Sequence, residues 1–172
     1  MTFIKSAGEP TLVLGEPPLL PWLPGLPGGE ALLADFMATA FGPAREAFAH
    51  GEAERGVQAF IDGVLGAGMF GRIPPPVRAG MLDNADEMRL ETVTPAAVYF
   101  PAFTPDDAGR VTQPTLLVSG ELSPPVFGRI SDALAQCLLR AERVTILGAS
   151  RAIHLGNPPA YNEAVRDFLS RH

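Results

Sequence analysis

Four residues of this chain have side chains that could support acid–base chemistry. Glu16 and Glu121 each directly follow a short apolar run that ends in glycine, and Arg151 and His154 lie near the C-terminal end. Two carboxylates can act as acid and base when their surroundings separate their pKa values, and a histidine titrates close to neutral pH. An arginine stays protonated and cannot accept a proton. Their use therefore depends on which elements bring them together.

The two glutamates are expected at the ends of parallel strands. Residues 11–15, 114–120 and 143–148 are short apolar runs that end in glycine, and the last two are each followed by a stretch with apolar residues at helical spacing. Strands alternating with amphipathic helices indicate an α/β fold with parallel strands. Ligands of such sheets gather at the carboxyl ends of the strands, which is where Glu16 and Glu121 stand.

Two helix starts can be assigned from capping residues. Ser123 precedes Pro-Pro and Asn157 precedes Pro-Pro, and both side chains can cap a helix whose first turn tolerates proline. We therefore predict helices from about residue 124 and from about residue 158. His154 would lie in the loop before the second helix, where it could instead be a packed or hydrogen-bonded histidine.

A long insertion separates the first two strands. Residues 17–29 are rich in proline, glycine and leucine and predict a loop, in which Trp22 and Leu19 either line a substrate mouth or pack in the core. Residues 31–50, 52–65 and 74–90 have helical spacing of apolar residues, with a break or restart at Pro43. This is far more chain than a crossover needs, so we predict a helical cap insertion at approximately residues 28–108.

Composition limits the class of protein. The chain has 172 residues, 13 basic and 19 acidic residues and a formal net charge of -6, with no basic cluster that would bind nucleic acid. No stretch approaches the roughly 20 apolar residues of a membrane span, and the N-terminal residues do not resemble a signal peptide. A single cysteine fits a reducing compartment. We therefore expect a cytoplasmic protein with no nucleic-acid or membrane partner, no cofactor and no metal.

The order of motifs resembles a known family. Thr-Leu-Val-Leu-Gly-Glu-Pro-Pro, a helical insertion, Pro-Thr-Leu-Leu-Val-Ser-Gly-Glu and a final loop ending in Asn-Pro before an amphipathic helix follow one another. This order is similar to the C-terminal half of the α/β-hydrolase fold family, with these strands as the sixth to the eighth. The resemblance covers the whole chain. It implies a single partial α/β-hydrolase domain over residues 1–172, with about three parallel strands, flanking helices and a helical cap insertion.

The resemblance also implies a catalytic mechanism. Full-length relatives hydrolyse an ester or a similar small apolar substrate with a serine nucleophile, a histidine base and an acid. The nucleophile stands in Gly-x-Ser-x-Gly, which does not occur in these 172 residues, so we expect the nucleophile-bearing half to be absent from the chain.

The base and the acid can be assigned by the same resemblance. The base is expected at Arg151, which is not competent, and His154 lies three residues further on, roughly 10 Å away along an extended loop. The acid is expected at Ser123 or, in other members, at Glu16; we prefer Glu16, with Glu121 second. Either glutamate could instead cap backbone N–H groups.

Three functional hypotheses follow. The first is a hydrolase relative that is inactive as this isolated chain. The second is a non-catalytic half-fold that assembles with a complementing N-terminal chain or with itself, because residues 11–15 or 143–147 would expose an open apolar edge. The third is a complete small enzyme that uses Glu16 and Glu121 as its two carboxylates.

Overall fold

The fold is a four-stranded sheet with helices on both faces, here described from a computed structural model that covers residues 2–4, 9–95, 98, 100 and 102–172. The strands are β1 (Thr2–Ile4), β2 (Thr11–Gly15), β3 (Thr115–Gly120) and β4 (Ala141–Ile146), in the order β1-β2-β3-β4. The pairs β2–β3 and β3–β4 are parallel, with Leu12 opposite Thr115 and Thr115 opposite Ala141. The prediction of about three parallel strands is confirmed.

Strand β1 is an element that the sequence did not predict. It pairs antiparallel with β2, with Thr2 opposite Val13 and Ile4 opposite Thr11. Three residues are too short to display a strand pattern, and they become a strand only through hydrogen bonds to β2.

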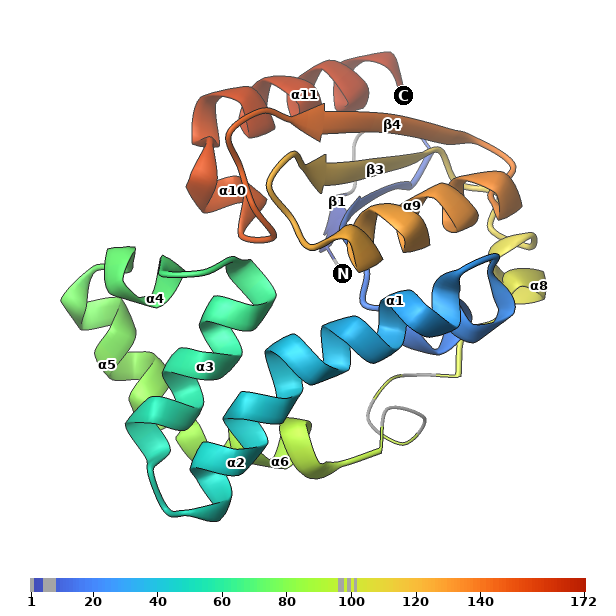
Figure 1. Cartoon of the computed structure of the whole chain (residues 1–172). Coiled ribbons are helices and arrows are strands. Elements are labelled where there is room, and N and C mark those ends of the chain that lie inside the picture. Colours follow the sequence, from blue (N-terminus) through green and yellow to red (C-terminus); the bar gives the residue numbers. More distant parts are fainter. Residues whose placement is uncertain (1, 5–8, 96–97, 99, 101) are drawn as a thin grey trace.

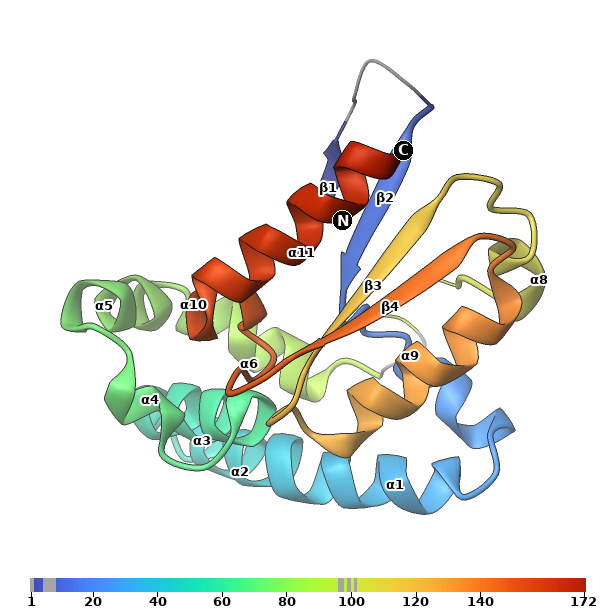
Figure 2. The same cartoon turned by 90° about the horizontal axis from the view of Figure 1, so that it is seen from above.

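Helices α9 (Pro125–Cys137) and α11 (Pro158–Arg171) cover opposite faces of the sheet, as Figure 2 shows. Side chains alternate along β3, so that Leu116 and Val118 pack with Phe168 of α11, whereas Leu117 packs in the larger core beside Ile130 of α9. Burial on both faces explains why this strand is an uninterrupted apolar run.

The caps of these two helices differ from each other. The Asn157 side chain accepts a hydrogen bond from the Ala160 N–H at 3.3 Å, which confirms the predicted cap. The capping prediction for Ser123 is wrong, because α9 has Pro124 at its N-cap position and no side-chain cap. The Ser123 hydroxyl is instead buried, and it lies beside the residues of the candidate site described below.

The described part of the segment between β2 and β3 is mostly helical. Its elements are η1 (Leu20–Gly25), α1 (Gly29–Phe36), η2 (Met37–Phe41), α2 (Gly42–Ala49), α3 (Ala53–Leu65), α4 (Met69–Arg72), α5 (Pro75–Asp83), α6 (Ala85–Val93) and α8 (Pro105–Ala108). In Figure 1, α3, α4 and α5 lie on the side toward which the strands β3 and β4 point. These helices therefore stand over the carboxyl ends of the parallel strands.

Prolines shape this segment in two places, and one predicted helix is divided at a third. The π-helical η2 lies just before Pro43, and the Gly42 N–H reaches back to the Met37 carbonyl, so the predicted break is a wider turn within one continuous helical run. The predicted loop at residues 17–29 contains the short 3₁₀ helix η1, which has Pro21 in its first turn. The predicted helix at residues 74–90 is divided into α5 and α6 at Asn84.

Of the two strands predicted to expose an open edge, β4 does lie at the edge of the sheet, whereas the prediction for residues 11–15 is wrong. The outer edge of β2 is paired with β1. The edge strand β4 carries Glu142, which pairs with Arg171 and His172, and Arg143, which pairs with Asp132. Charged side chains on an edge strand discourage pairing with a further strand.

Candidate functional site

Glu16 lies at the carboxyl end of β2 in a strained and buried position. Its φ is 43°, in the left-handed region that a residue with a side chain rarely adopts, and only 1% of the residue is exposed. Its Oε1 accepts a hydrogen bond from the Gly120 N–H at the end of β3, at 2.9 Å. The tight turn after β2 therefore directs the carboxyl group under the neighbouring strand rather than toward water.

The surroundings of Glu16 make its charged form less stable than that of an exposed carboxyl group. Burial raises the pKa of this carboxyl above its usual value, and the Ser123 hydroxyl, the Gly120 N–H and the Arg151 charge oppose part of that rise. By geometric criteria its Oε2 makes no hydrogen bond with the described residues, although the Ser123 hydroxyl lies close enough to lower the pKa of the carboxyl group. A buried acid with one free oxygen is chemically able to receive a further donor or to hold a proton there.

Arg151 lies directly beside this glutamate. Its Nη1 donates to the Glu16 backbone carbonyl at 2.8 Å, and its guanidinium lies over the Phe127 ring of α9 at 4.0 Å from the ring centre. Burial lowers the pKa of Arg151, while the carboxylates of Glu16 and Glu91 raise it. An arginine remains charged under these conditions, so it can bind acceptors and cannot act as a base.

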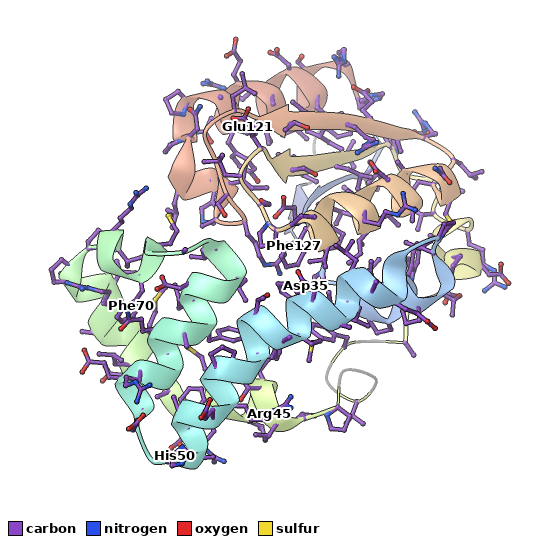
Figure 3. The ribbon with its side chains drawn as sticks, viewed as in Figure 1. Asp35, Arg45, His50, Phe70, Glu121 and Phe127 are labelled. Atoms are coloured by element: carbon purple, nitrogen blue, oxygen red, sulfur yellow. The ribbon has the colours of Figure 1, made fainter. Side chains whose placement is uncertain are left out.

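The other two predicted site residues are not brought to this place. Glu121 is exposed, and its Oε2 accepts from the Gly148 N–H at 2.9 Å, where Gly148 has a φ of 69°. His154 is exposed in the short helix α10 (Ile153–Gly156), with its ring edge toward Tyr161 at 6.3 Å. Figure 3 shows Glu121 well away from Phe127. In this structure Glu121 caps backbone, the alternative considered for it above.

Trp22 and Leu19 are both core residues. Leu19 is 7% exposed and Trp22 8%, and both belong to the larger hydrophobic core. The Trp22 ring stacks on Phe103 at 6.1 Å and its Nε1 donates to the Phe103 carbonyl at 2.6 Å. Trp22 also borders a cavity of about 440 Å³, which Leu19 does not line. The stacking and the hydrogen bond account for Trp22 without a ligand.

A cavity of about 450 Å³ lies beside Arg151, within the size range of small-molecule sites. Its lining comes both from loops and helices next to the sheet and from the helical segment, and it is dominated by apolar and aromatic side chains: Pro18, Leu20, Phe36, Phe41, Phe60, Val64, Glu91, Phe100, Phe127 and Arg151. The charged members are Glu91 and Arg151. This arrangement can hold a small apolar molecule against one fixed cation.

Three residues of this site were not predicted from the sequence. The sequence indicates only the end of a strand at Gly120, and it gives no signal that Phe127 or Glu91 belongs to a site. The Glu16–Gly120 hydrogen bond joins residues 104 positions apart, and no local pattern reports such a contact. Arg151 had been identified, but only as a base position occupied by an unsuitable residue.

The comparisons with known proteins agree with this architecture. No protein-family model and no curated protein matches the chain. Solved structures do match. MenH from S. aureus has a TM-score of 0.61 at 15% identity, over 94% of this chain and 59% of that one. A thermophilic esterase has a TM-score of 0.57 at 22% identity, over 75% and 50%, and proline iminopeptidase from Mycobacterium smegmatis has 0.52 at 19% identity, over 83% and 52%.

These similarities establish the fold. The matched structures are α/β-hydrolases, and the chain has part of the α/β-hydrolase fold. It spans about half the length of the solved structures that it matches. In the described part of the chain, no helix is long and apolar enough to cross a membrane.

Proposed function

We propose that this chain provides the acid and the substrate-covering helices of an α/β-hydrolase-type site for a small apolar ester or similar molecule. In this proposal the helices between β2 and β3 are the cap, and Glu16 is the acid. The nucleophile would come from a segment outside these 172 residues, in the same polypeptide or in another. A cytoplasmic location with no cofactor remains part of the proposal.

The observation that supports this proposal is the buried Glu16 carboxyl group beside an apolar cavity. The carboxyl group lies at the end of a parallel strand, is held by the Gly120 N–H at 2.9 Å and keeps one oxygen without a partner among the described residues. An acid that orients a catalytic base needs this kind of position, fixed at one oxygen and free at the other.

Arg151 implies that the isolated chain does not hydrolyse esters. The guanidinium occupies the space beside Glu16 and donates to its backbone carbonyl, and a group that stays protonated cannot take a proton from a nucleophile. His154 is exposed on α10 and contacts Tyr161, so it does not replace the base in this structure.

The test is hydrolysis of short nitrophenyl esters by the purified chain. We expect a rate equal to that of the buffer control, and we expect Arg151→His to remain inactive because these residues contain no nucleophile turn. The proposal of an inactive chain would be wrong if the wild type hydrolysed the ester and Glu16→Gln or His154→Ala abolished that activity.

A complementing chain is the second candidate function. The observation in its favour is that the chain spans about half the length of its structural neighbours while retaining the Glu16 side of the sheet. In this candidate the chain binds its partner without catalysing a reaction. Mixing with a separately produced N-terminal half of a hydrolase that yields a stable complex would support it, and a mixture in which both remain separate would count against it.

A further inference from the structure

Arg151 lines this cavity, and only part of the hydrogen-bonding capacity of its guanidinium is used by neighbouring described residues. A guanidinium has five N–H donors. Within the described part of the chain, Arg151 makes a hydrogen bond through Nη1, to the Glu16 carbonyl, and its flat face rests on Phe127. Arg151 lines a cavity whose other walls are mostly apolar. Donors in such a place can hydrogen-bond an acceptor on a bound molecule.

The charges around the guanidinium determine which acceptor fits. Glu91 lines the same cavity and interacts favourably with the charge of Arg151, as Glu16 also does. A ligand carboxylate would gain attraction from Arg151 but would be repelled by Glu91 in the same small space. A cationic ligand would be repelled by Arg151. A neutral oxygen acceptor avoids both penalties.

The shape and lining of the cavity determine the rest of the ligand. Four phenylalanine rings contribute to the walls, and all of them meet edge to face: Phe36 with Phe127 at 5.5 Å, Phe36 with Phe41 at 5.8 Å and Phe41 with Phe60 at 5.5 Å. Another ring can join such a cluster with the same edge-to-face or offset contacts. An aromatic ligand therefore suits these walls better than an extended polar one.

We propose that this cavity binds a small, uncharged aromatic amide or ester, whose carbonyl oxygen accepts a hydrogen bond from Arg151. Arg151 is then a specificity-determining residue rather than the remnant of a lost base. This proposal rests on the proposed function in placing the substrate between the sheet and the cap, but it concerns binding and not turnover.

The test uses three probes of nearly identical shape and different charge: benzamide, benzoate and benzamidine. Binding to the full chain is measured for each by ligand-observed NMR at neutral pH. We expect benzamide to bind about tenfold more tightly than either charged analogue. Benzoate binding as tightly as benzamide, or more tightly, would overturn the assignment of an uncharged ligand.

Two variants connect the binding to this cavity. Arg151→Met keeps an unbranched apolar stem and removes the guanidinium donors, so we expect benzamide affinity to fall about tenfold. Val64→Phe retains Arg151 and fills part of the cavity, so we expect a similar loss. Arg110→Met is the matched control, because the Arg110 side chain is 77% exposed and pairs with Asp107 outside the cavity.

The outcomes separate this proposal from the proposed function. If Arg151→Met does not fold, the comparison of the three probes on the wild type and the Val64→Phe variant still decides the matter. Unchanged benzamide binding in Val64→Phe would show that the probe binds elsewhere and would overturn the proposal. Ester hydrolysis by a chain that binds benzamide would contradict only the inactivity argued under the proposed function.

Discussion

At the scale of single residues, Glu16 is the most unusual position of the chain. A glutamate in the left-handed region costs roughly 1–2 kcal/mol compared with an ordinary backbone conformation, and burial adds a penalty for its charge. Contacts with Gly120 and Arg151 offset part of both costs. Strained residues of this kind persist where the surrounding structure holds them, often at binding or catalytic sites.

The raised pKa of Glu16 predicts a pH-dependent stability difference between the wild type and Glu16→Gln. Because the folded state holds the proton more tightly than the unfolded state, the stabilising contribution is complete below the unfolded pKa, near 4.5, and is lost as pH rises through the raised folded pKa. Glutamine cannot ionise and keeps an oxygen for the Gly120 N–H. We therefore expect the unfolding free energy of Glu16→Gln minus that of the wild type to increase with pH above about 4.5.

Urea unfolding of both proteins at several pH values measures this difference. The comparison at each pH cancels the titration of all the other groups. A difference that stays constant from about pH 4 to about pH 8, or that shrinks as pH rises, would contradict a raised pKa.

At the scale of elements, the end of β3 and the loop after β4 hold the residues of the candidate site in position. The Leu122 N–H donates to the Ala149 carbonyl at 2.9 Å, and the Ser150 hydroxyl donates to the Leu65 carbonyl at the end of α3. This loop leads directly into Arg151. These hydrogen bonds connect the sheet to the helical segment, and they fix the position of the Arg151 guanidinium.

The backbone of the loop after β4 packs closely against Gly120. A Cβ atom there would lie 2.5 Å from the Ala149 carbonyl oxygen and 2.8 Å from that of Ser150, both of which are backbone atoms. We expect Gly120→Ala to lower the free energy of unfolding by about 1–3 kcal/mol or more. Thermal or urea unfolding measures the loss.

A second glycine provides the matched control. Gly128 lies within α9, and a Cβ atom there would meet nothing within 4 Å. Gly128→Ala should stabilise the chain by roughly 0.5–1 kcal/mol, because alanine favours a helix interior. Equal effects at the two positions would show that the loop after β4 does not pack on Gly120 as described.

At the scale of the whole molecule, the sheet protects both of its edges. Strand β1 covers one edge by pairing with β2. The other edge is β4, where Glu142 and Arg143 form ion pairs. Exposed ion pairs of this kind contribute little to stability, but charge on an edge strand limits edge-to-edge pairing. We therefore expect β1 to limit self-association through the edge of β2.

We expect removal of β1 to promote self-association through the edge of β2. A variant that begins at Glu9 lacks the three residues that pair with β2, and it exposes unpaired backbone groups along Thr11–Gly15. We expect its average mass in sedimentation equilibrium to rise with concentration more steeply than that of the full chain. Identical concentration dependence in the two proteins would mean that β1 does not protect this edge.

Much of the fold could be predicted from the sequence because local patterns determine it. The strands at residues 11–15 and 115–120, the helix at 53–65 and the Asn157 cap depend on apolar spacing and on side-chain chemistry within a few residues. Glu16 and Arg151 were also identified from the sequence as residues that could matter. Each of these conclusions needed only near neighbours along the chain.

Only the tertiary structure decided how these residues are combined. It paired β1 with β2, left Ser123 without a capping role, moved Glu121 and His154 away from the site, and placed Arg151 against Glu16 and Phe127. These outcomes depend on packing between segments as distant as β2 and the final loop, where burial, strain and charge are set together. The sequence by itself determined which groups are available for chemistry, whereas long-range packing decided which of them meet.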